Sequence, residues 1–300
     1  MRILVISDIV RWKGFEEIFD KIKPDVVILP GDLTSDGFAA FWSETVQQIP
    51  KFQSEKATLM KKMGIIINEY GIANCSKKHN LEEWIVAIDS LEDKYKHSQD
   101  FLDMRKKIHV DKFYDFLRYA GKKSKVLVIR GDHDEDFKDD YIVEKINKIP
   151  GCKEISGKLV EIDGLSFLGL GYNDTYYLTV FKPIIEKFKD RIDIVATHCK
   201  QNRVPMLSQL NPKLIIRGHH GSGHYLINNI PAIFTQGVKY TVIEMNKKGM
   251  PKIVQYVLDS NDKLVVLKEG TCKPWGSDPA ISQFDIYDWL KPYPEVSSHV

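Results

Sequence analysis

The chain has 300 residues, 43% of them hydrophobic, so it can bury a substantial core as one large domain or as a domain with an insertion. Its 43 Lys and Arg against 41 Asp and Glu give a formal charge of +2, which excludes the bulk basicity typical of many nucleic-acid-binding proteins. The four cysteines form no C-x-x-C pair, which argues against a zinc ribbon and against a secreted disulfide framework. The first apolar run is too short for a signal peptide or a membrane span, so we expect a cytoplasmic protein with no membrane partner.

Short β-branched runs alternate with helix-like segments along much of the chain. Each run is apolar throughout and is cut off by Gly, Asp or His, which is typical of buried strands. The runs are Ile3–Ser7, Val26–Leu29, Val126–Ile129, Ile192–Ala196 and Leu214–Ile216. This alternation predicts βαβ units, and therefore an α/β fold with a mainly parallel sheet. After residue 223 the runs are separated by short polar turns, which indicates an antiparallel portion.

Residues 38–124 interrupt this alternation. Apolar side chains there recur at the helical spacing i, i+3, i+4 and i+7, for example in Leu81, Trp84, Ile85 and Ile88. We therefore expect a main domain, 1–261, that is interrupted by a helical insertion or cap, 38–124, and followed by a C-terminal extension, 262–300. The lysines of the insertion are interleaved with acids, which favours a solvated face over a nucleic-acid-binding surface.

A turn that carries an acid or a histidine follows each predicted strand. The turns are Ser7-Asp8, Gly31-Asp32, Gly131-Asp132-His133-Asp134, Thr197-His198 and Gly218-His219-His220. Because the carboxyl ends of strands in an open α/β sheet converge on one crevice, we expect these residues to meet there. A single such residue is more often a helix N-cap or a hydrogen-bonded core histidine, but five in succession favour a metal site. Carboxylate and imidazole ligands suit Mn²⁺, Fe or Zn²⁺ better than Mg²⁺ or Ca²⁺.

The order of these turns resembles the motif series D-x-H, G-D, G-N-H-D/E, H and G-H-x-H of the calcineurin-like metallophosphoesterases. The resemblance extends from residue 3 to about residue 245, without the insertion. It implies an αββα sandwich with a two-metal site between the sheets.

The resemblance also implies a role for each matching residue. Asp8 corresponds to a ligand of metal 1, and Asp32 to the aspartate that bridges both metals. His198 and His219 correspond to ligands of metal 2. Asp132 stands at the asparagine position of the same set. His133 corresponds to the histidine that protonates the leaving group or steadies the phosphate.

Three positions depart from the family pattern. Val10 replaces the histidine of the first motif, Asp132 replaces asparagine, and Gly221 replaces the second histidine of G-H-x-H. Two of these changes remove metal ligands, so the site could hold one ion or two. His220 or His224 could replace a missing ligand, although a hydrogen bond to a ligand or a surface position is the simpler interpretation for both. We expect Asp134 and the two acids after it to begin the following helix, where acids suit the helix dipole.

These observations predict a metal-dependent phosphoesterase, with manganese among the expected metals and a phosphate mono- or diester as substrate. Water activated by the metal attacks phosphorus, and His133 serves as general acid. One alternative is a catalytically degenerate scaffold or binding subunit, which Val10 and Gly221 favour. The other is a nuclease, although the near-neutral charge does not indicate a nucleic-acid partner. The sequence does not indicate the physiological substrate or the oligomeric state.

Overall fold

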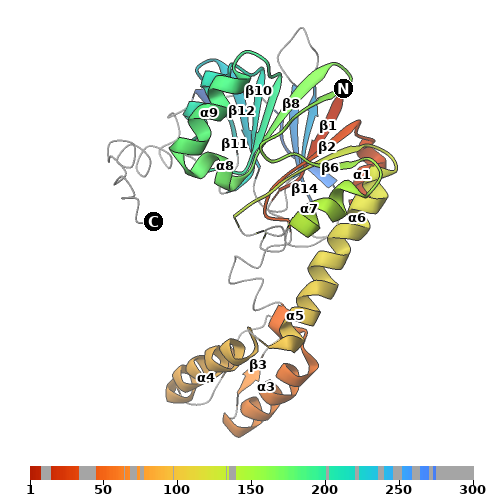
Figure 1. Cartoon of the computed structure of the whole chain (residues 1–300). Helices are drawn as coiled ribbons and strands as arrows, with labels where there is room; N and C mark the ends of the chain where they lie inside the picture. The colour runs from red at the N-terminus through yellow and green to blue at the C-terminus, as the bar shows by residue number, and fades with distance from the viewer. Residues whose placement is uncertain are drawn as a thin grey trace. The chain divides into compact units, whose positions relative to one another are not determined.

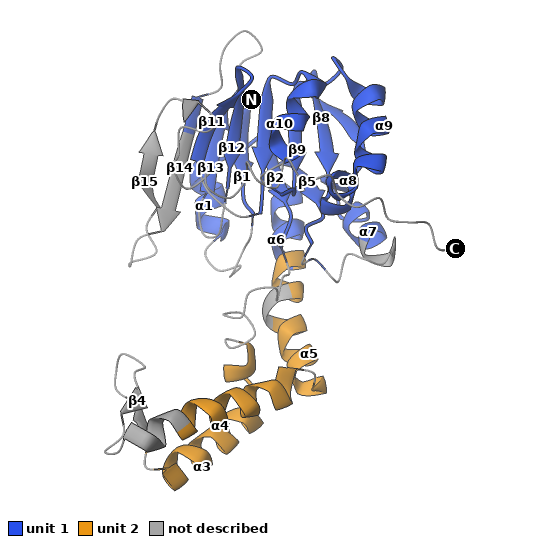
Figure 2. Ribbon diagram, turned by 90° about the vertical axis from the view of Figure 1, so that its left-hand side faces the viewer, with its two compact units in different colours: residues 1–34, 115–300 blue, residues 35–114 orange. Residues whose placement is uncertain are grey.

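The chain forms two compact units in the computed structural model: unit 1 contains residues 1–34 and 115–300, and unit 2 contains residues 35–114 (Figure 2). Most of unit 2 lies within the expected insertion, 38–124. The structure describes residues 1–7, 15–33, 45–63, 65–67, 73–74, 78–96, 98–132, 134, 140–200, 203–219, 223–235, 240–245, 252–258, 264–269 and 273–274.

The described residues of unit 1 form two sheets of seven strands each. The first sheet contains β1 (Arg2–Val5), β2 (Val26–Pro30), β5 (Lys125–Ile129), β6 (Cys152–Glu154), β13 (Tyr240–Glu244), β14 (Lys252–Leu258) and β15 (Leu264–Glu269). The second sheet contains β7 (Leu159–Ile162), β8 (Leu165–Leu170), β9 (Ile194–Thr197), β10 (Leu214–Arg217), β11 (Gly223–Ile227), β12 (Ile230–Phe234) and β16 (Lys273–Pro274).

Both sheets are mixed. The strand order of the first is β15-β14-β13-β1-β2-β5-β6, and β1, β2, β5 and β6 run parallel while β13, β14 and β15 are antiparallel to their neighbours. The order of the second is β16-β11-β12-β10-β9-β8-β7, with β12, β10, β9 and β8 parallel (Figure 1). The five predicted strands are confirmed, as is the antiparallel pairing after residue 223, except that β12 pairs in parallel with β10.

The two sheets enclose a single apolar layer. Alternate residues of the strands point into it, such as Ile3 and Val5 of β1, Val26 and Ile28 of β2, and Ile194 and Ala196 of β9. The same layer contains Phe167, which is fully buried. Since each strand gives every second side chain to this layer, the remaining side chains must be covered from outside.

Helices provide that cover on both outer faces. Phe181 and Ile185 pack with Leu168 and Leu170 of β8 on the second sheet. On the first sheet, Phe15 lies edge-to-face against Tyr240 of β13 and against Phe116, with ring centroids 5.4 Å and 5.3 Å apart respectively. The helices in the described residues of unit 1 are α1 (Phe15–Ile22), the part of α6 (Asp111–Gly121) from residue 115 onward, α7 (Asp140–Asn147), α8 (Tyr172–Tyr176), α9 (Leu178–Phe188), α10 (Val204–Leu207) and the short η4 (Ser208–Leu210). The order helix, sheet, sheet, helix confirms the predicted αββα sandwich.

Unit 2 is mainly helical and has its own small core. It contains α3 (Pro50–Met63), β3 (Ile66–Ile67), β4 (Ala73–Asn74), α4 (Lys78–Lys96), α5 (Gln99–Arg105) and the π-helical η1 (Lys106–Val110). Phe52 of α3 and Tyr95 of α4 pack edge-to-face, and the Tyr95 hydroxyl donates to Glu55 over 2.8 Å. Burial and this bond to Glu55 raise the pKa of Tyr95 to about 12. Helices α3, α4 and α5 lie in the segment for which helices were expected.

Two further expectations concern the C-terminal segment 262–300 and helices that could cross a membrane. The described part of the segment 262–300 forms β15 and β16, which pair with β14 and β11 respectively. None of the helices in the described parts of the chain combines the length and the hydropathy that crossing a bilayer requires.

Asp193 ties together the starts of three strands of the second sheet. Its carboxylate accepts from the backbone N–H of Ser166 at 2.8 Å, from the Ser166 hydroxyl at 3.0 Å and from Lys213 Nζ at 2.6 Å. Partial burial raises the pKa of Asp193, but the bonds from Lys213 and Ser166 outweigh that effect and hold it below its ordinary value. The ionised carboxylate therefore stabilises the fold above its unfolded pKa, and this stabilisation is lost as the pH falls toward the folded pKa.

We predict that Asp193→Asn lowers the free energy of unfolding at pH 7 by about 1–3 kcal/mol, as expected for hydrogen bonds to a charged group. The difference from wild type should narrow as the pH falls below about 4.5, because wild type then loses the same ionised group. Urea unfolding at several pH values measures both quantities. Asp163→Asn, at an exposed turn position before β8, is the control and should match wild type throughout. If the difference in unfolding free energy between wild type and Asp193→Asn grows at acid pH, the role assigned to the ionised Asp193 is contradicted.

Candidate metal centre and active site

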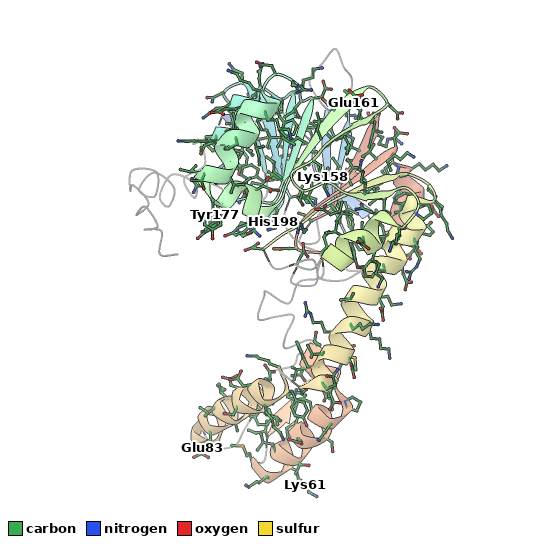
Figure 3. The ribbon with its side chains drawn as sticks, in the orientation of Figure 1. Lys61, Glu83, Lys158, Glu161, Tyr177 and His198 are labelled. Carbon is green, nitrogen blue, oxygen red and sulfur yellow. The ribbon has the colours of Figure 1, made fainter. Side chains whose placement is uncertain are left out.

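Four of the predicted ligands lie at the carboxyl ends of four parallel strands. Asp32 follows β2 and Asp132 follows β5 in the first sheet, while His198 follows β9 and His219 follows β10 in the second. Figure 3 shows His198 at this end of unit 1. The four side chains therefore approach one another from both sheets, as the convergence of strand ends predicts.

The donor atoms of these four residues all lie within 4.8 Å of one another. His198 Nε2 is 2.9 Å from Asp132 Oδ1, 3.1 Å from His219 Nδ1 and 3.4 Å from Asp32 Oδ2. His219 Nδ1 is 3.4 Å from the same Asp132 oxygen. Asp32 and His198 are almost fully buried, and the Asp132 side chain is 21% exposed. The cluster thus has one side that solvent can reach.

Other predicted positions lie outside the described residues or outside the cluster. Asp8, the predicted ligand of metal 1, and His133, the predicted general acid, belong to the first group, as do Val10, His220 and Gly221. His224 is described: it is a buried residue of β11, paired in register with Ile233, and is not a member of the four-residue cluster.

The hydrogen bond made by Nδ1 of His198 determines whether Nε2, which faces the cluster, carries a proton or a lone pair. Nδ1 lies 2.8 Å from the carbonyl oxygen of Pro30, the last residue of β2. A carbonyl oxygen only accepts, so Nδ1 carries a proton, and in the neutral ring Nε2 then presents a lone pair to the cluster. That lone pair faces oxygens of Asp132 and Asp32, which are also acceptors. Such an arrangement requires positive charge at its centre, either a second proton on His198 or a cation.

The ionisation states of Asp132 and His219 favour the binding of a cation. Burial raises the pKa of Asp132, but the neighbouring imidazoles of His198 and His219 outweigh it and hold the pKa well below its ordinary range. Burial lowers the pKa of His219, against the opposing effect of Asp132. Asp132 is therefore a carboxylate and His219 a neutral imidazole near pH 7, which are the forms in which these side chains bind metals. With a backbone carbonyl orienting His198, the donor set fits a divalent transition-metal ion.

The sequence around the aspartates allows this close approach. A Cβ atom on Gly31 would overlap the His198 ring, and a Cβ atom on Gly131 would overlap the Asp32 carboxylate. Asp32 and His219 adopt left-handed backbone conformations, with φ of 54° and 72°. Non-glycine residues adopt this region uncommonly, and such strain concentrates at functional sites.

Asp134 has a different role from the one predicted. Asp134 itself is not helical, and α7 as described spans Asp140–Asn147. Its buried carboxylate accepts three backbone N–H groups instead: Asp32 and Gly131 donate to Oδ2, each over 2.8 Å, and Leu33 donates to Oδ1 over 2.6 Å. It thereby joins the loop after β2 to the loop after β5 and positions Asp32 and Asp132.

Arg217 supports the histidine side of the site. This arginine is 1% exposed; its Nε donates to the carbonyl oxygen of Cys199 over 2.7 Å, and its guanidinium lies 4.7 Å from the centre of the Phe234 ring. It therefore fixes the turn that carries His198. Burial raises the pKa of the Cys199 thiol, so Cys199 is a neutral packed thiol.

A pocket of about 460 Å³ opens beside the cluster. Its walls come from the loop after β5, from Ser156 and from the start of α8. The described residues of its lining are Arg130, Gly131, Asp132, Asp134, Ser156, Gly171, Tyr172, Asn173 and Asp174. The ring of Tyr172 also lies against the site, with its centre 6.4 Å from that of His198 and 6.0 Å from that of His219. The sequence motifs include Gly131, Asp132 and Asp134 of this lining, but no motif includes Ser156 or the four residues from Gly171 to Asp174.

We predict that Asp134→Asn disrupts the cluster, because an amide has one acceptor oxygen where the three backbone N–H groups now share two. The expected result is a loss of about 10–100-fold in metal affinity, as for other residues that orient ligands, measured by competition with a chelator. Asp193→Asn is the matched control: it also removes a multiply bonded carboxylate, but at the opposite ends of the strands, and should keep wild-type affinity. Equal affinity of Asp134→Asn and wild type would contradict the positioning role.

Comparisons with known proteins bear on this site. A family model described as calcineurin-like phosphoesterase matches residues 1–65. A search of curated proteins finds no match to the sequence. One solved crystal structure superposes with a TM-score of 0.48 at 13% sequence identity, covering 90% of this chain and 99% of its own.

Two further solved structures are similar to the chain at lower scores. The crystal structure of TT1561 of Thermus thermophilus has a TM-score of 0.43 and 11% identity, covering 84% of this chain and 97% of that one. Vps29 of Chaetomium thermophilum has a TM-score of 0.34 and 11% identity, covering 89% of this chain and 93% of that one. The match of residues 1–65, which include Asp8 and Asp32, to the calcineurin-like phosphoesterases confirms the resemblance that the motifs indicated.

Proposed function

We propose that the protein is a metal-dependent phosphoesterase whose ion is held by Asp32, Asp132, His198 and His219. The observation that carries this proposal is the orientation of His198, whose Pro30 bond turns a lone pair toward two carboxylates. The match of residues 1–65 to calcineurin-like phosphoesterases supports phosphate esters as the substrate class.

The residues present determine what the site can do. A divalent cation bound there supplies Lewis acidity, which lowers the pKa of water and offsets charge on the phosphoryl oxygens. Asp32 and Asp132 together balance the charge of one such ion. Two imidazoles and two carboxylates favour Mn²⁺, Fe or Zn²⁺. We further propose Asp8 as a ligand of a second ion.

The leaving oxygen needs a proton when the departing group is an alkoxide. We propose that His133 donates it, as the family motif at this position implies. A general acid of this kind contributes typically about 10²–10⁴-fold to the rate.

A scaffold or binding subunit is the second candidate function. Val10 and Gly221 favour it, because each stands where the family motif has a metal-binding histidine. The two functions differ in one measurable respect, since a scaffold can bind a metal without turning over a phosphate ester.

We predict opposite outcomes for two isosteric changes in the cluster. Asp32→Asn should abolish hydrolysis of bis-para-nitrophenyl phosphate in Mn²⁺ and lower metal content, because a buried carboxylate ligand becomes neutral. Asp132→Asn recreates the amide of the family motif, whose oxygen can still coordinate, so it should keep turnover with weaker metal affinity. Elemental analysis and hydrolysis assays on both variants and wild type test the pair.

The possible results of this experiment distinguish the two functions and identify the required ligands. Metal bound by wild type with no turnover favours the scaffold. Failure of wild type to bind any transition metal contradicts the proposed centre. Loss of turnover in Asp132→Asn as complete as in Asp32→Asn shows that both carboxylates are required ligands.

A separate prediction concerns His133. His133→Ala should slow hydrolysis of an alkyl phosphate ester by about 10²–10⁴-fold, while slowing a nitrophenyl ester much less, because nitrophenolate leaves without protonation. Metal content should stay at the wild-type level. The comparison of both esters by initial rates checks this, and an equal loss on the two esters would reject the role of general acid.

A further inference from the structure

The pocket beside Asp132 indicates which organic group is attached to the phosphate of the substrate. All of its described lining residues belong to unit 1. It begins at Asp132, a member of the metal cluster, so a group held in the pocket is adjacent to a phosphate at the cluster.

Hydrogen bonds between the wall segments fix the shape of the pocket. The Ser156 hydroxyl accepts from the Arg130 backbone N–H at 3.1 Å, and the Arg130 carbonyl accepts from the Tyr172 N–H at 3.2 Å. Asp174 accepts from the Gly171 N–H at 2.8 Å. These bonds connect the ends of β5 and β8 with Ser156, the second residue after β6. A pocket whose walls are bonded to one another is preformed, so little ordering free energy opposes binding.

The volume indicates more than a phosphoryl group. Pockets of roughly 300–1,000 Å³ hold drug-sized ligands, and about 460 Å³ falls in that range. An inorganic phosphate or a methyl ester would leave most of this space filled with water. The pocket therefore suits an ester group that contains a ring system.

The charge of the lining disfavours an anionic group. Among the described lining residues there is one guanidinium, that of Arg130, against the carboxyl groups of Asp132, Asp134 and Asp174. The Arg130 charge is already partly balanced, because its Nε lies 3.3 Å from the buried carboxylate of Glu154. Burial raises the pKa of Asp174, and its carboxyl group accepts a hydrogen bond from the Gly171 backbone N–H. A second phosphate on the ligand would meet net negative charge here.

We propose that this pocket binds a neutral, hydrogen-bonding ring of nucleoside size on the phosphate ester. Tyr172 packs against the ring and the Asn173 amide bonds its polar edge. This inference rests on the proposed phosphoesterase function and specifies its substrate. An aromatic wall and a side-chain amide are the groups that recognise planar heterocycles in proteins.

Equilibrium binding tests the pocket without depending on turnover. Titration calorimetry on the metal-loaded protein compares three ligands that share one phosphate: methyl phosphate, thymidylate, and thymidylate with a second phosphate on its sugar. Thymidylate should bind at least about tenfold more tightly than methyl phosphate, because only its ring fills the pocket. The second phosphate should give no further gain.

Two variants and a matched control locate the effect. Asn173→Ala and Tyr172→Leu should each reduce the preference for thymidylate over methyl phosphate by about tenfold. Tyr177→Ala is the control, because Tyr177 is 53% exposed, follows the same helix and does not line the pocket. It should keep the wild-type preference. Metal content is measured for each variant, since Tyr172 lies against the cluster histidines.

The outcomes separate the pocket from the proposed function. Equal affinity for thymidylate and methyl phosphate, or tighter binding of the doubly phosphorylated ligand, overturns the pocket assignment even if phosphate esters are hydrolysed. A preference for thymidylate that depends on Asn173, in a protein that hydrolyses no ester, supports the pocket and rejects the phosphoesterase. A preference that Asn173→Ala and Tyr172→Leu leave unchanged also overturns the assignment.

Discussion

The imidazole of His198 links the two sheets of unit 1 at their carboxyl ends. The ring belongs to the second sheet, where it follows β9, but both of its nitrogens contact the first sheet: Nδ1 the Pro30 carbonyl at the end of β2, and Nε2 the Asp132 carboxylate after β5. The apolar layer between the sheets ends at this point. The same contacts that close the sandwich therefore set the direction in which Nε2 points, so fold and site share one set of bonds.

Holding acceptor groups this close together is unfavourable without a positive charge, and the fold contains specific features that resist their separation. Asp134 occupies the backbone N–H groups of both aspartate loops. Arg217 secures the turn after β9 from the opposite side. The left-handed conformations of Asp32 and His219 add local strain. A core built for stability alone would place apolar side chains here, because buried ionic groups stabilise a fold only weakly.

The cluster could be predicted from the sequence because its residues are placed by the order and direction of the strands. A run such as Val26–Leu29 is apolar throughout and so is a buried parallel strand, and the residue after such a strand lies at a known edge of the sheet. Strands β6, β7 and β8 were not predicted, since no acid or histidine turn marks them and β7 and β8 form a local hairpin within a region interpreted only in outline. The role of Asp134 could not be predicted either. Its three donors come from two loops, and an acid after a strand has the same local pattern whether it caps a helix or bridges loops.

The charge of the proposed metal centre and the charge of the pocket both disfavour a substrate with further anionic groups. In the proposed enzyme, one divalent ion with the carboxylates of Asp32 and Asp132 forms a centre with no net charge, whereas the amide of the family motif would leave it positive. A positive centre attracts polyanions such as chains of phosphates, and a neutral one does so much less. The pocket next to it has more carboxyl groups than cations in its described lining. Asp132 belongs to both, so a single substitution relative to the family motif changes the balance at the ion and at the pocket together, and both changes favour an ester whose organic group is uncharged.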